Sequence, residues 1–83
     1  MEYQVEFSPQ TRKDLEVLPP RICKQTLKKI VDLQRAAFKG PQIKPLKSYG
    51  DLFRLRVGDY RVVYQIKGNQ VTVLLIGHRK DIY

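Results

Sequence analysis

Hydrophobic and polar residues alternate with a period of two at the start of the chain and again in its last third. Residues 2–7 (EYQVEF) place an apolar side chain at every second position, which predicts a strand with one exposed face. From residue 51 onward, the segments LFRLRV, YRVVYQIK and QVTVLLIGH are separated by Gly58-Asp59 and Gly68-Asn69. Such pairs form two-residue hairpin turns. The pattern therefore predicts an antiparallel meander of three strands.

The period changes to three and four residues between the first strand and the meander. Ser8 is a suitable N-cap for a helix through PQTRKDLEVL, and Pro19-Pro20 ends that helix. A second helix is predicted through RICKQTLKKIVDLQRAAF, with one apolar and one basic face, and Gly40-Pro41 closes it. The following QIKPLKSYG is typical of a loop. We expect an α+β fold of an N-terminal strand, a two-helix hairpin and the meander, with both helices packed on one face of the sheet.

Length and composition restrict the protein to one folded domain. A chain of 83 residues is too short for two separate cores, so residues 1–83 are expected to form a single domain. The lone cysteine, Cys23, excludes an internal disulfide and a cysteine-rich zinc site. No apolar segment is long enough to span a bilayer, and the N-terminus is acidic where a signal peptide is basic. A cytoplasmic protein is therefore expected.

The formal charge of +8 is distributed unevenly along the chain. Residues 1–20 carry −2, residues 21–47 carry +7 and residues 48–83 carry +3. A small domain with this imbalance is expected to attract polyanions, and nucleic acid is the first candidate. Charge alone does not distinguish RNA from DNA, a membrane surface or an acidic protein.

The predicted turns divide the meander into an apolar and a basic face. They place Arg56 opposite Arg61, Tyr64 opposite Val73 and Val62 opposite Leu75. The face expected to pack under the helices comprises Phe53, Leu55, Val57, Tyr60, Val62, Tyr64, Ile66, Val71, Val73 and Leu75. The other face is expected to carry Arg54, Arg56, Arg61, Gln65, Thr72 and His78, around Val63, Leu74 and Ile76.

The arginines of the basic face are placed at an energetic cost. Like charges directly opposite each other, as predicted for Arg56 and Arg61, destabilise a sheet by about 0.5 kcal/mol. Guanidinium groups on neighbouring strands can clamp a phosphate, because their planar donors match its oxygens. An exposed basic face can instead serve only to prevent aggregation. That alternative explains the charge but not its concentration on one hairpin.

Three segments resemble the RelE/ParE superfamily of bacterial and archaeal toxins: VEFSPQTRKDLEVLP, KPLKSYGDLFRLRVGDYRVVYQI and IGHRKDIY. The resemblance extends over essentially the whole chain, and GDYRVVY combined with HRKDIY favours the RelE branch. It implies the toxin of a type II toxin–antitoxin system, an mRNA interferase that cleaves messenger RNA in the ribosomal A site. The implied partners are a cognate antitoxin, the ribosome with its 16S rRNA, and mRNA. No metal, cofactor or membrane is implied.

The resemblance also assigns roles to individual residues. Arg61 is expected to stabilise the phosphorane, Arg79 to assist the leaving oxygen and Tyr83 to orient the nucleotide. Arg56 joins this catalytic group, whereas Lys44, Lys47 and Arg54 are expected to bind RNA, together with the basic face of the second helix.

The proton acceptor is the point of departure from the family. Several members carry lysines in the strand that here carries Arg54 and Arg56, and arginine effectively cannot give up its proton. His78 is the first alternative, because its unperturbed pKa is about 6.5. Tyr83 is the second. The third is that no strong base exists and that alignment of the RNA on the ribosome provides most of the acceleration.

Two other functions are compatible with the same sequence. A ParE-like toxin has the same fold but inhibits DNA gyrase and cleaves no RNA. A relic or operon repressor would bind nucleic acid or a partner without catalysis. Fold similarity does not decide among them.

Overall fold

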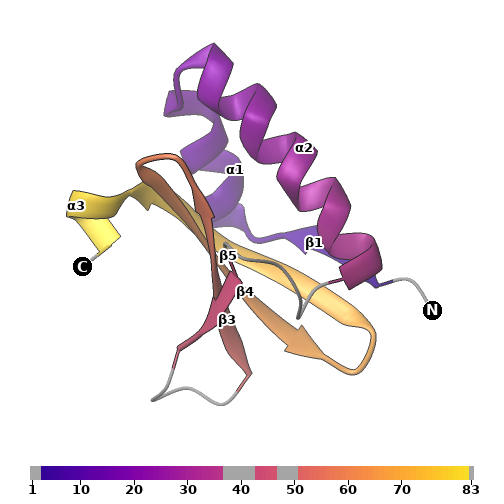
Figure 1. Cartoon of the computed structure of the whole chain (residues 1–83). Helices are drawn as coiled ribbons and strands as arrows, with labels where there is room; N and C mark the ends of the chain where they lie inside the picture. The colour runs from indigo at the N-terminus through magenta and orange to yellow at the C-terminus, as the bar shows by residue number, and fades with distance from the viewer. Residues whose placement is uncertain (1–2, 37–42, 47–50, 83) are drawn as a thin grey trace.

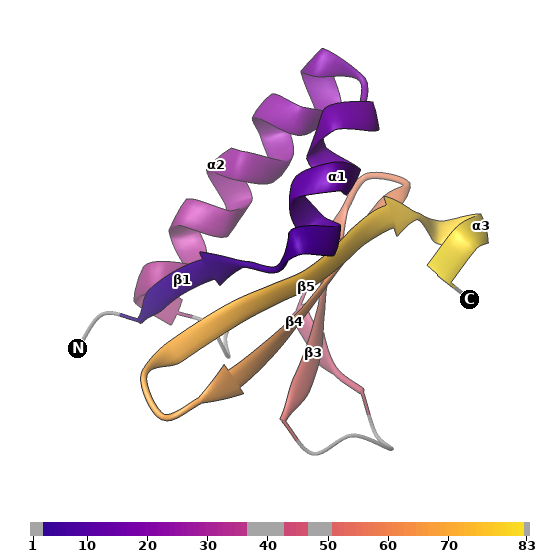
Figure 2. The same ribbon diagram turned by 180° about the vertical axis from the view of Figure 1, so that it is seen from behind.

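A computed structural model of the chain describes residues 3–36, 43–46 and 51–82. It contains a five-stranded sheet with two helices packed on one face (Figure 1, and from behind in Figure 2). The α+β fold predicted from the sequence is confirmed. The elements follow in the order β1 (Gln4–Phe7), α1 (Pro9–Val17), α2 (Pro20–Ala36), β2 (Ile43–Pro45), β3 (Leu52–Val57), β4 (Tyr60–Lys67), β5 (Gln70–His78) and α3 (Arg79–Ile82).

The strands are arranged in the order β1-β5-β4-β3-β2. The meander of β3, β4 and β5 is confirmed, and β1 lies at one edge, parallel to β5. The opposite edge is β2, within the segment expected to be a loop, so that expectation is wrong for Ile43–Pro45. Proline is tolerated there because an edge strand needs ladder hydrogen bonds on one side only.

The register of the meander agrees with the prediction up to a bulge in β5. Tyr64 pairs with Val73, as expected, but Val63 pairs with Leu75, so Leu74 is an additional residue on β5. The predicted pairing of Val62 with Leu75 is therefore wrong, since Val62 pairs with Ile76. A bulge of one residue moves every later side chain of the strand to the other face.

Helix α1 completes the hydrogen bonding of β5 where β1 ends. Strand β1 pairs with β5 only as far as Val73. Beyond it, the Ser8 hydroxyl donates to the carbonyl of Leu74 (2.7 Å), and Asp14 Oδ2 accepts the N–H of Ile76 (2.9 Å). Ser8 Oγ also accepts a backbone N–H of the first helical turn (3.1 Å), so the predicted N-cap is confirmed. The helix is thereby fixed at the bulge.

The core lies between α2 and the covered face of the sheet. Its largest fully buried side chain is Tyr64, and burial raises the pKa of this phenol. Other buried members are Leu18, Ile30, Leu33, Leu55, Val57, Val62, Ile66, Val71, Val73 and Ile76. Cys23 is partly buried against this cluster. Within the described parts of the chain, no helix has the length and apolar character needed to cross a membrane.

Candidate active site

The turn between β3 and β4 lies at one end of the basic face. Gly58 adopts a φ of +59°, in the left-handed region that other residues rarely occupy. Gly68 adopts +58° in the equivalent position of the next hairpin. In a two-residue turn with glycine first, the backbone twist matches that of the flanking strands. The turn therefore aligns the last residues of β3 with the first residues of β4.

Arg61 lies between a second arginine and a position without a side chain. Arg56 and Arg61 are directly opposed across β3 and β4, as predicted. On the other side, Arg61 is paired with Gly77 of β5, which leaves the space beside it unfilled by that strand. Arg61 is only 8% exposed, whereas Arg56 is exposed. A buried arginine beside another arginine is rare unless an anion compensates for it.

Two further cations extend this face toward the sheet edge. Lys44 of β2 is paired with Arg54 of β3, and Arg54 is paired with Val63 of β4. Because paired residues project from the same face and alternate residues share a face, Lys44, Arg54, Arg56 and Arg61 all lie on the side away from α1 and α2. The prediction that Arg54, Arg56 and Arg61 share one face of the sheet is confirmed.

Backbone carbonyls of the turn hold the two opposed guanidinium groups. Arg61 Nη1 donates to the carbonyl oxygens of Gly58 (3.0 Å) and Tyr60 (3.1 Å). Arg56 Nε donates to the same Gly58 oxygen over 3.4 Å. The Nε of Arg61 is buried and has no hydrogen-bond partner among the described residues. A buried donor without a partner is unfavourable, and a hydrogen bond to an anion would relieve that cost.

The surroundings of Arg61 disfavour its own charge. Burial lowers the pKa of Arg61, and the nearby guanidinium groups of Arg56, Arg54 and Arg79 lower it further. Asp59 acts in the opposite direction. Four positive charges thus act on one another at this end of the sheet, and a bound anion would relieve their repulsion.

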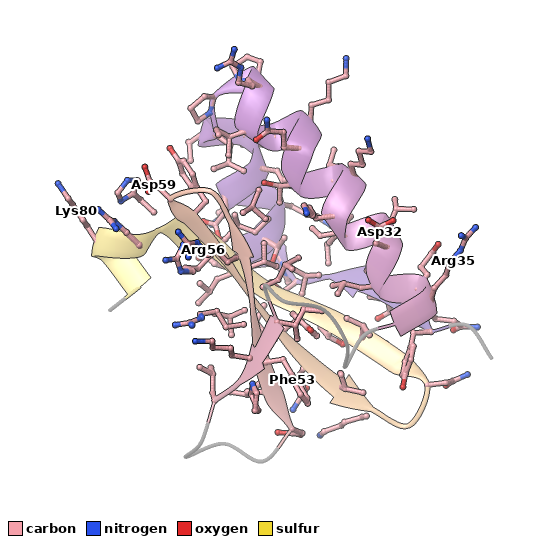
Figure 3. The ribbon with its side chains drawn as sticks, in the orientation of Figure 1. Asp32, Arg35, Phe53, Arg56, Asp59 and Lys80 are labelled. Carbon is pink, nitrogen blue, oxygen red and sulfur yellow. The ribbon has the colours of Figure 1, made fainter. Side chains whose placement is uncertain are left out.

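The C-terminal segment reaches the site through Asp59. The backbone N–H of Arg79 donates to the Asp59 carbonyl (2.8 Å), and Arg79 Nε lies 4.0 Å from Asp59 Oδ1. Figure 3 shows Asp59, Arg56 and Lys80 at this same end of the molecule. Arg79 comes close to the other arginines because the β3–β4 turn holds the start of α3.

His78 does not lie on the arginine face, which corrects the expectation from strand alternation. The bulge pairs it with Tyr60, and the two rings meet edge to face with centroids 5.3 Å apart. Its Nδ1 accepts the N–H of Lys80 (3.2 Å). This bond occupies the lone pair of Nδ1 and directs it toward the Lys80 backbone. Of the other predicted site residues, Lys47 and Tyr83 lie outside the described residues.

Sequence reasoning missed two members of the site. Gly77 faces Arg61 because of the bulge, and Asp59 joins the turn to α3. The bulge has no signal in the hydrophobic pattern. Asp59 did have one, since it belongs to the predicted Gly58-Asp59 turn, but it was interpreted only as a turn residue. Among the described residues, no three histidine, cysteine or acidic side chains lie together as a metal site.

The chain is similar to known toxins over nearly its full length. The sequence model of the family described as "ParE toxin of type II toxin-antitoxin system, parDE" matches residues 5–83. Toxin RelG of Mycobacterium tuberculosis is 37% identical over 87 residues, covering 100% of this chain and 98% of the relative. Toxin RelE3 of Methanocaldococcus jannaschii is 31% identical, covering 96% and 94%.

Solved structures give the same result for the fold. The toxin–antitoxin complex RelBE2 from Mycobacterium tuberculosis has a chain that matches with a TM-score of 0.83 and 34% identity, over 95% of this chain and 100% of that chain. The RelB–RelE antitoxin–toxin complex from Methanococcus jannaschii matches with a TM-score of 0.81 and 30% identity, over 94% of both chains.

Proposed function

Since the chain belongs to the RelE/ParE superfamily of toxins from type II toxin–antitoxin systems, we propose that it is a RelE-type mRNA interferase. Its substrate is messenger RNA in the A site of the ribosome. The observation that carries the proposal is Arg61, a guanidinium that is 8% exposed, has a buried Nε without a described partner and faces a second arginine. These features suit one backbone phosphate.

The proposed reaction requires only the RNA, water and the protein's side chains. The 2′-oxygen of the RNA attacks the adjacent phosphorus as its proton passes to Tyr83 or to water, and the bond from phosphorus to the 5′-oxygen breaks as that oxygen takes up a proton from water. The products are a 2′,3′-cyclic phosphate and a free 5′-hydroxyl. The pentacoordinate phosphorane between them carries an additional negative charge. Arg61 and Arg56 stabilise this charge, because their donors are fixed by the Gly58 carbonyl before the substrate arrives.

The remaining roles are those that the family resemblance implies, and the positions of Arg79, Lys44 and Arg54 support them. Arg79 adjoins the turn that holds Arg56 and Arg61, so it supplies positive charge to the leaving 5′-oxygen. Tyr83 orients the nucleotide. Lys44, Arg54 and Lys47 bind the neighbouring RNA, and the first two share a face with Arg56.

The geometry makes His78 a poor proton acceptor in this mechanism. Its Nδ1 is occupied by the Lys80 N–H, and its ring lies beside Tyr60 on the other face of the sheet. Tyr83 and the alignment of the RNA by the ribosome therefore remain as the sources of acceleration. Correct alignment of a 2′-hydroxyl with its leaving oxygen can by itself account for several powers of ten in rate.

A cognate antitoxin is the second proposed partner. The solved relatives at 34% and 30% identity are toxin–antitoxin complexes, and their folds agree with this chain over more than nine-tenths of its length. Binding of the antitoxin would keep the toxin inactive in the growing cell. We place the complex in the cytoplasm, where ribosomes and mRNA occur.

The test is cleavage of mRNA by purified protein in a translation reaction, with cut positions mapped by primer extension. Arg61→Ala should reduce the rate of ribosome-phased cleavage by about 100-fold or more, the usual loss for one transition-state donor. Arg12→Ala, at an exposed position on α1, is the matched control and should cleave normally. Full activity of a folded Arg61→Ala protein would refute the assignment.

Inhibition of DNA gyrase is the second candidate function. The observation that favours it is the match of residues 5–83 to a sequence model described as ParE toxin. Supercoiling by purified gyrase, measured with and without the protein, distinguishes the two. Inhibition of supercoiling without mRNA cleavage would establish the ParE-like activity instead.

A further inference from the structure

We propose that the cleft between α2 and the β3–β4 turn is a second site for RNA backbone phosphates, continuous with the site at Arg61. The inference rests on the proposed function and adds the path that the RNA takes beyond the cleaved phosphate. It assigns RNA contacts to Lys28 and Lys29, which lie far from Arg61 in the sequence.

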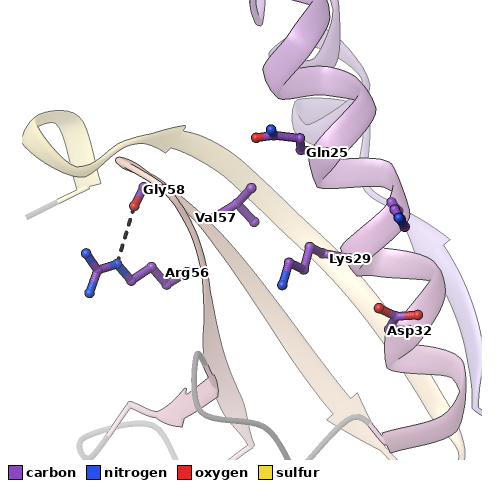
Figure 4. A pocket seen from close by; sticks show the side chains of 7 residues that line it. Gln25, Lys29, Asp32, Arg56, Val57 and Gly58 are labelled. Atoms are coloured by element: carbon purple, nitrogen blue, oxygen red, sulfur yellow. Dashed lines mark hydrogen bonds between the residues drawn. The ribbon is translucent and has the colours of Figure 1, made fainter.

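One wall of the cleft is a polar stripe of α2, and the other is the end of β3. The stripe consists of Gln25, Lys28, Lys29 and Asp32, whose spacing of three and four residues places them on one side of the helix. The facing wall is the end of β3 at Arg56 and Val57. Figure 4 shows Val57 directed toward α2, whereas the guanidinium of Arg56 is directed away from α2, toward the Gly58 carbonyl at the rim of the cleft. The cleft has a volume of about 710 Å³, which lies within the range of ligand-binding clefts.

The charges in the cleft are available to a ligand. The residues that line the cleft include three exposed cations, Lys28, Lys29 and Arg56, and one carboxylate, that of Asp32. The ion pair found among the described residues joins Arg79 to Asp59, outside the cleft. Neither lysine forms an ion pair with a carboxylate among the described residues, as expected for residues that bind phosphates.

The composition of the cleft favours RNA over a protein segment. Its apolar lining residue is Val57, which is only 3% exposed, so a partner helix would bury almost no hydrophobic surface there. A second groove along α2 has the opposite character. It is lined by Val5, Phe7, Leu27, Ile30, Val31 and Gln34, and Val31 is 59% exposed. An apolar protein segment would bind in that groove rather than in the cleft of Lys28.

Arg56 connects the cleft to the Arg61 site. It lines the cleft, and its Nε shares the Gly58 carbonyl oxygen with Arg61 Nη1. A strand whose cleaved phosphate lies at Arg61 and Arg56 can therefore place its next phosphates at Lys28 and Lys29. Successive phosphates of a single strand repeat along a continuous backbone, which matches a row of cations that leads away from Arg61.

The test compares binding of 2′-O-methyl RNA, which cannot be cleaved, to the intact protein and to Lys28→Ala/Lys29→Ala. Each phosphate contact on a single strand contributes about 0.7 to the slope of log affinity against log salt, so losing two should reduce the slope by about 1.4. At about 0.15 M salt, this corresponds to about tenfold weaker binding of a long strand. A dinucleotide, which covers only the Arg61 site, should bind both proteins equally. Arg12→Ala/Lys13→Ala on α1 is the matched control and should change neither the affinity nor the slope, beyond its small effect on net charge.

The outcomes separate this proposal from the proposed function. Unchanged affinity and salt slope for the long strand, in a Lys28→Ala/Lys29→Ala protein with normal circular dichroism, would overturn the cleft as an RNA site even if the protein cleaves mRNA. Normal RNA binding with weakened binding of the antitoxin would assign the cleft to a protein partner and would also overturn it. By contrast, no cleavage of mRNA by the intact protein in a translation reaction would count against the proposed function.

Discussion

Replacing Arg56 with glutamine is expected to stabilise the fold while impairing RNA cleavage. Arg56 is directly opposed to Arg61, and such a pair of like charges costs about 0.5 kcal/mol. The substitution removes little stabilising interaction, because the Arg56 side chain is exposed and its hydrogen bond to the Gly58 carbonyl is long, at 3.4 Å. The free energy of unfolding should therefore rise by about 0.5 kcal/mol, which corresponds to about 2–4 °C in Tm for a domain of this size.

The assay is urea unfolding followed by circular dichroism, at low and high salt. The gain should be largest at low ionic strength and should nearly disappear at about 1 M salt, where the screening length falls to about 3 Å. Arg12→Gln on α1 is the matched control, since that exposed arginine has no opposed arginine in the sheet. Its stability should change little at any salt concentration.

The reasoning would be refuted if Arg56→Gln lowered the free energy of unfolding, or raised it equally at all salt concentrations. Either result would mean that the opposed arginines do not repel each other in the folded protein. The sheet would then need no anion on this face, and a phosphate bound there would relieve no repulsion.

Two further comparisons test the roles of backbone conformation and buried polar groups. Gly58→Ala and Gly68→Ala should each lower the free energy of unfolding by about 1 kcal/mol, because both glycines adopt a positive φ. Only Gly58→Ala should also slow mRNA cleavage, since the Gly58 carbonyl holds Arg56 and Arg61; equal cleavage by both variants would contradict this role. Thr26→Val should raise the free energy of unfolding by about 1 kcal/mol, because the buried Thr26 hydroxyl has no hydrogen-bond partner among the described residues. Thr11→Val should lower the free energy of unfolding by about as much, because it removes the 2.7 Å hydrogen bond to the Val73 carbonyl. Thermal unfolding of the two threonine variants should give Tm shifts of opposite sign, and shifts of the same sign would show that these hydroxyls are not energetically distinct.

Most of the fold was predictable because its signals are local. The glycine turns, the proline between the helices and the alternation of apolar residues fix the identity of α1, α2, β1 and the meander, and each signal lies within a few residues of the element that it specifies. The directly opposed Arg56 and Arg61 follow from the Gly58-Asp59 turn alone. The central feature of the candidate site was therefore present in the sequence.

The rest of the site depends on contacts between distant segments. The bulge at Leu74 coincides with the hydrogen bonds of Ser8 and Asp14 to β5, and these residues are about sixty positions away in the sequence. A period-two pattern cannot register one additional residue, so His78 was expected on the arginine face and Gly77 was overlooked. Strand β2 was missed because three residues containing Pro45 carry too little pattern to distinguish an edge strand from a loop.

The central claim is that the guanidinium of Arg61 is built to receive one backbone phosphate. It is tested most directly by following the arginine Nε–H resonances by NMR while a non-cleavable 2′-O-methyl dinucleotide is added. The account predicts that the Arg61 and Arg56 signals shift together, with one common affinity, while the signal of Arg12 stays unchanged. Shifts of similar size at Arg12 and Arg61, or a saturated complex in which the Arg61 signal does not move, would contradict it.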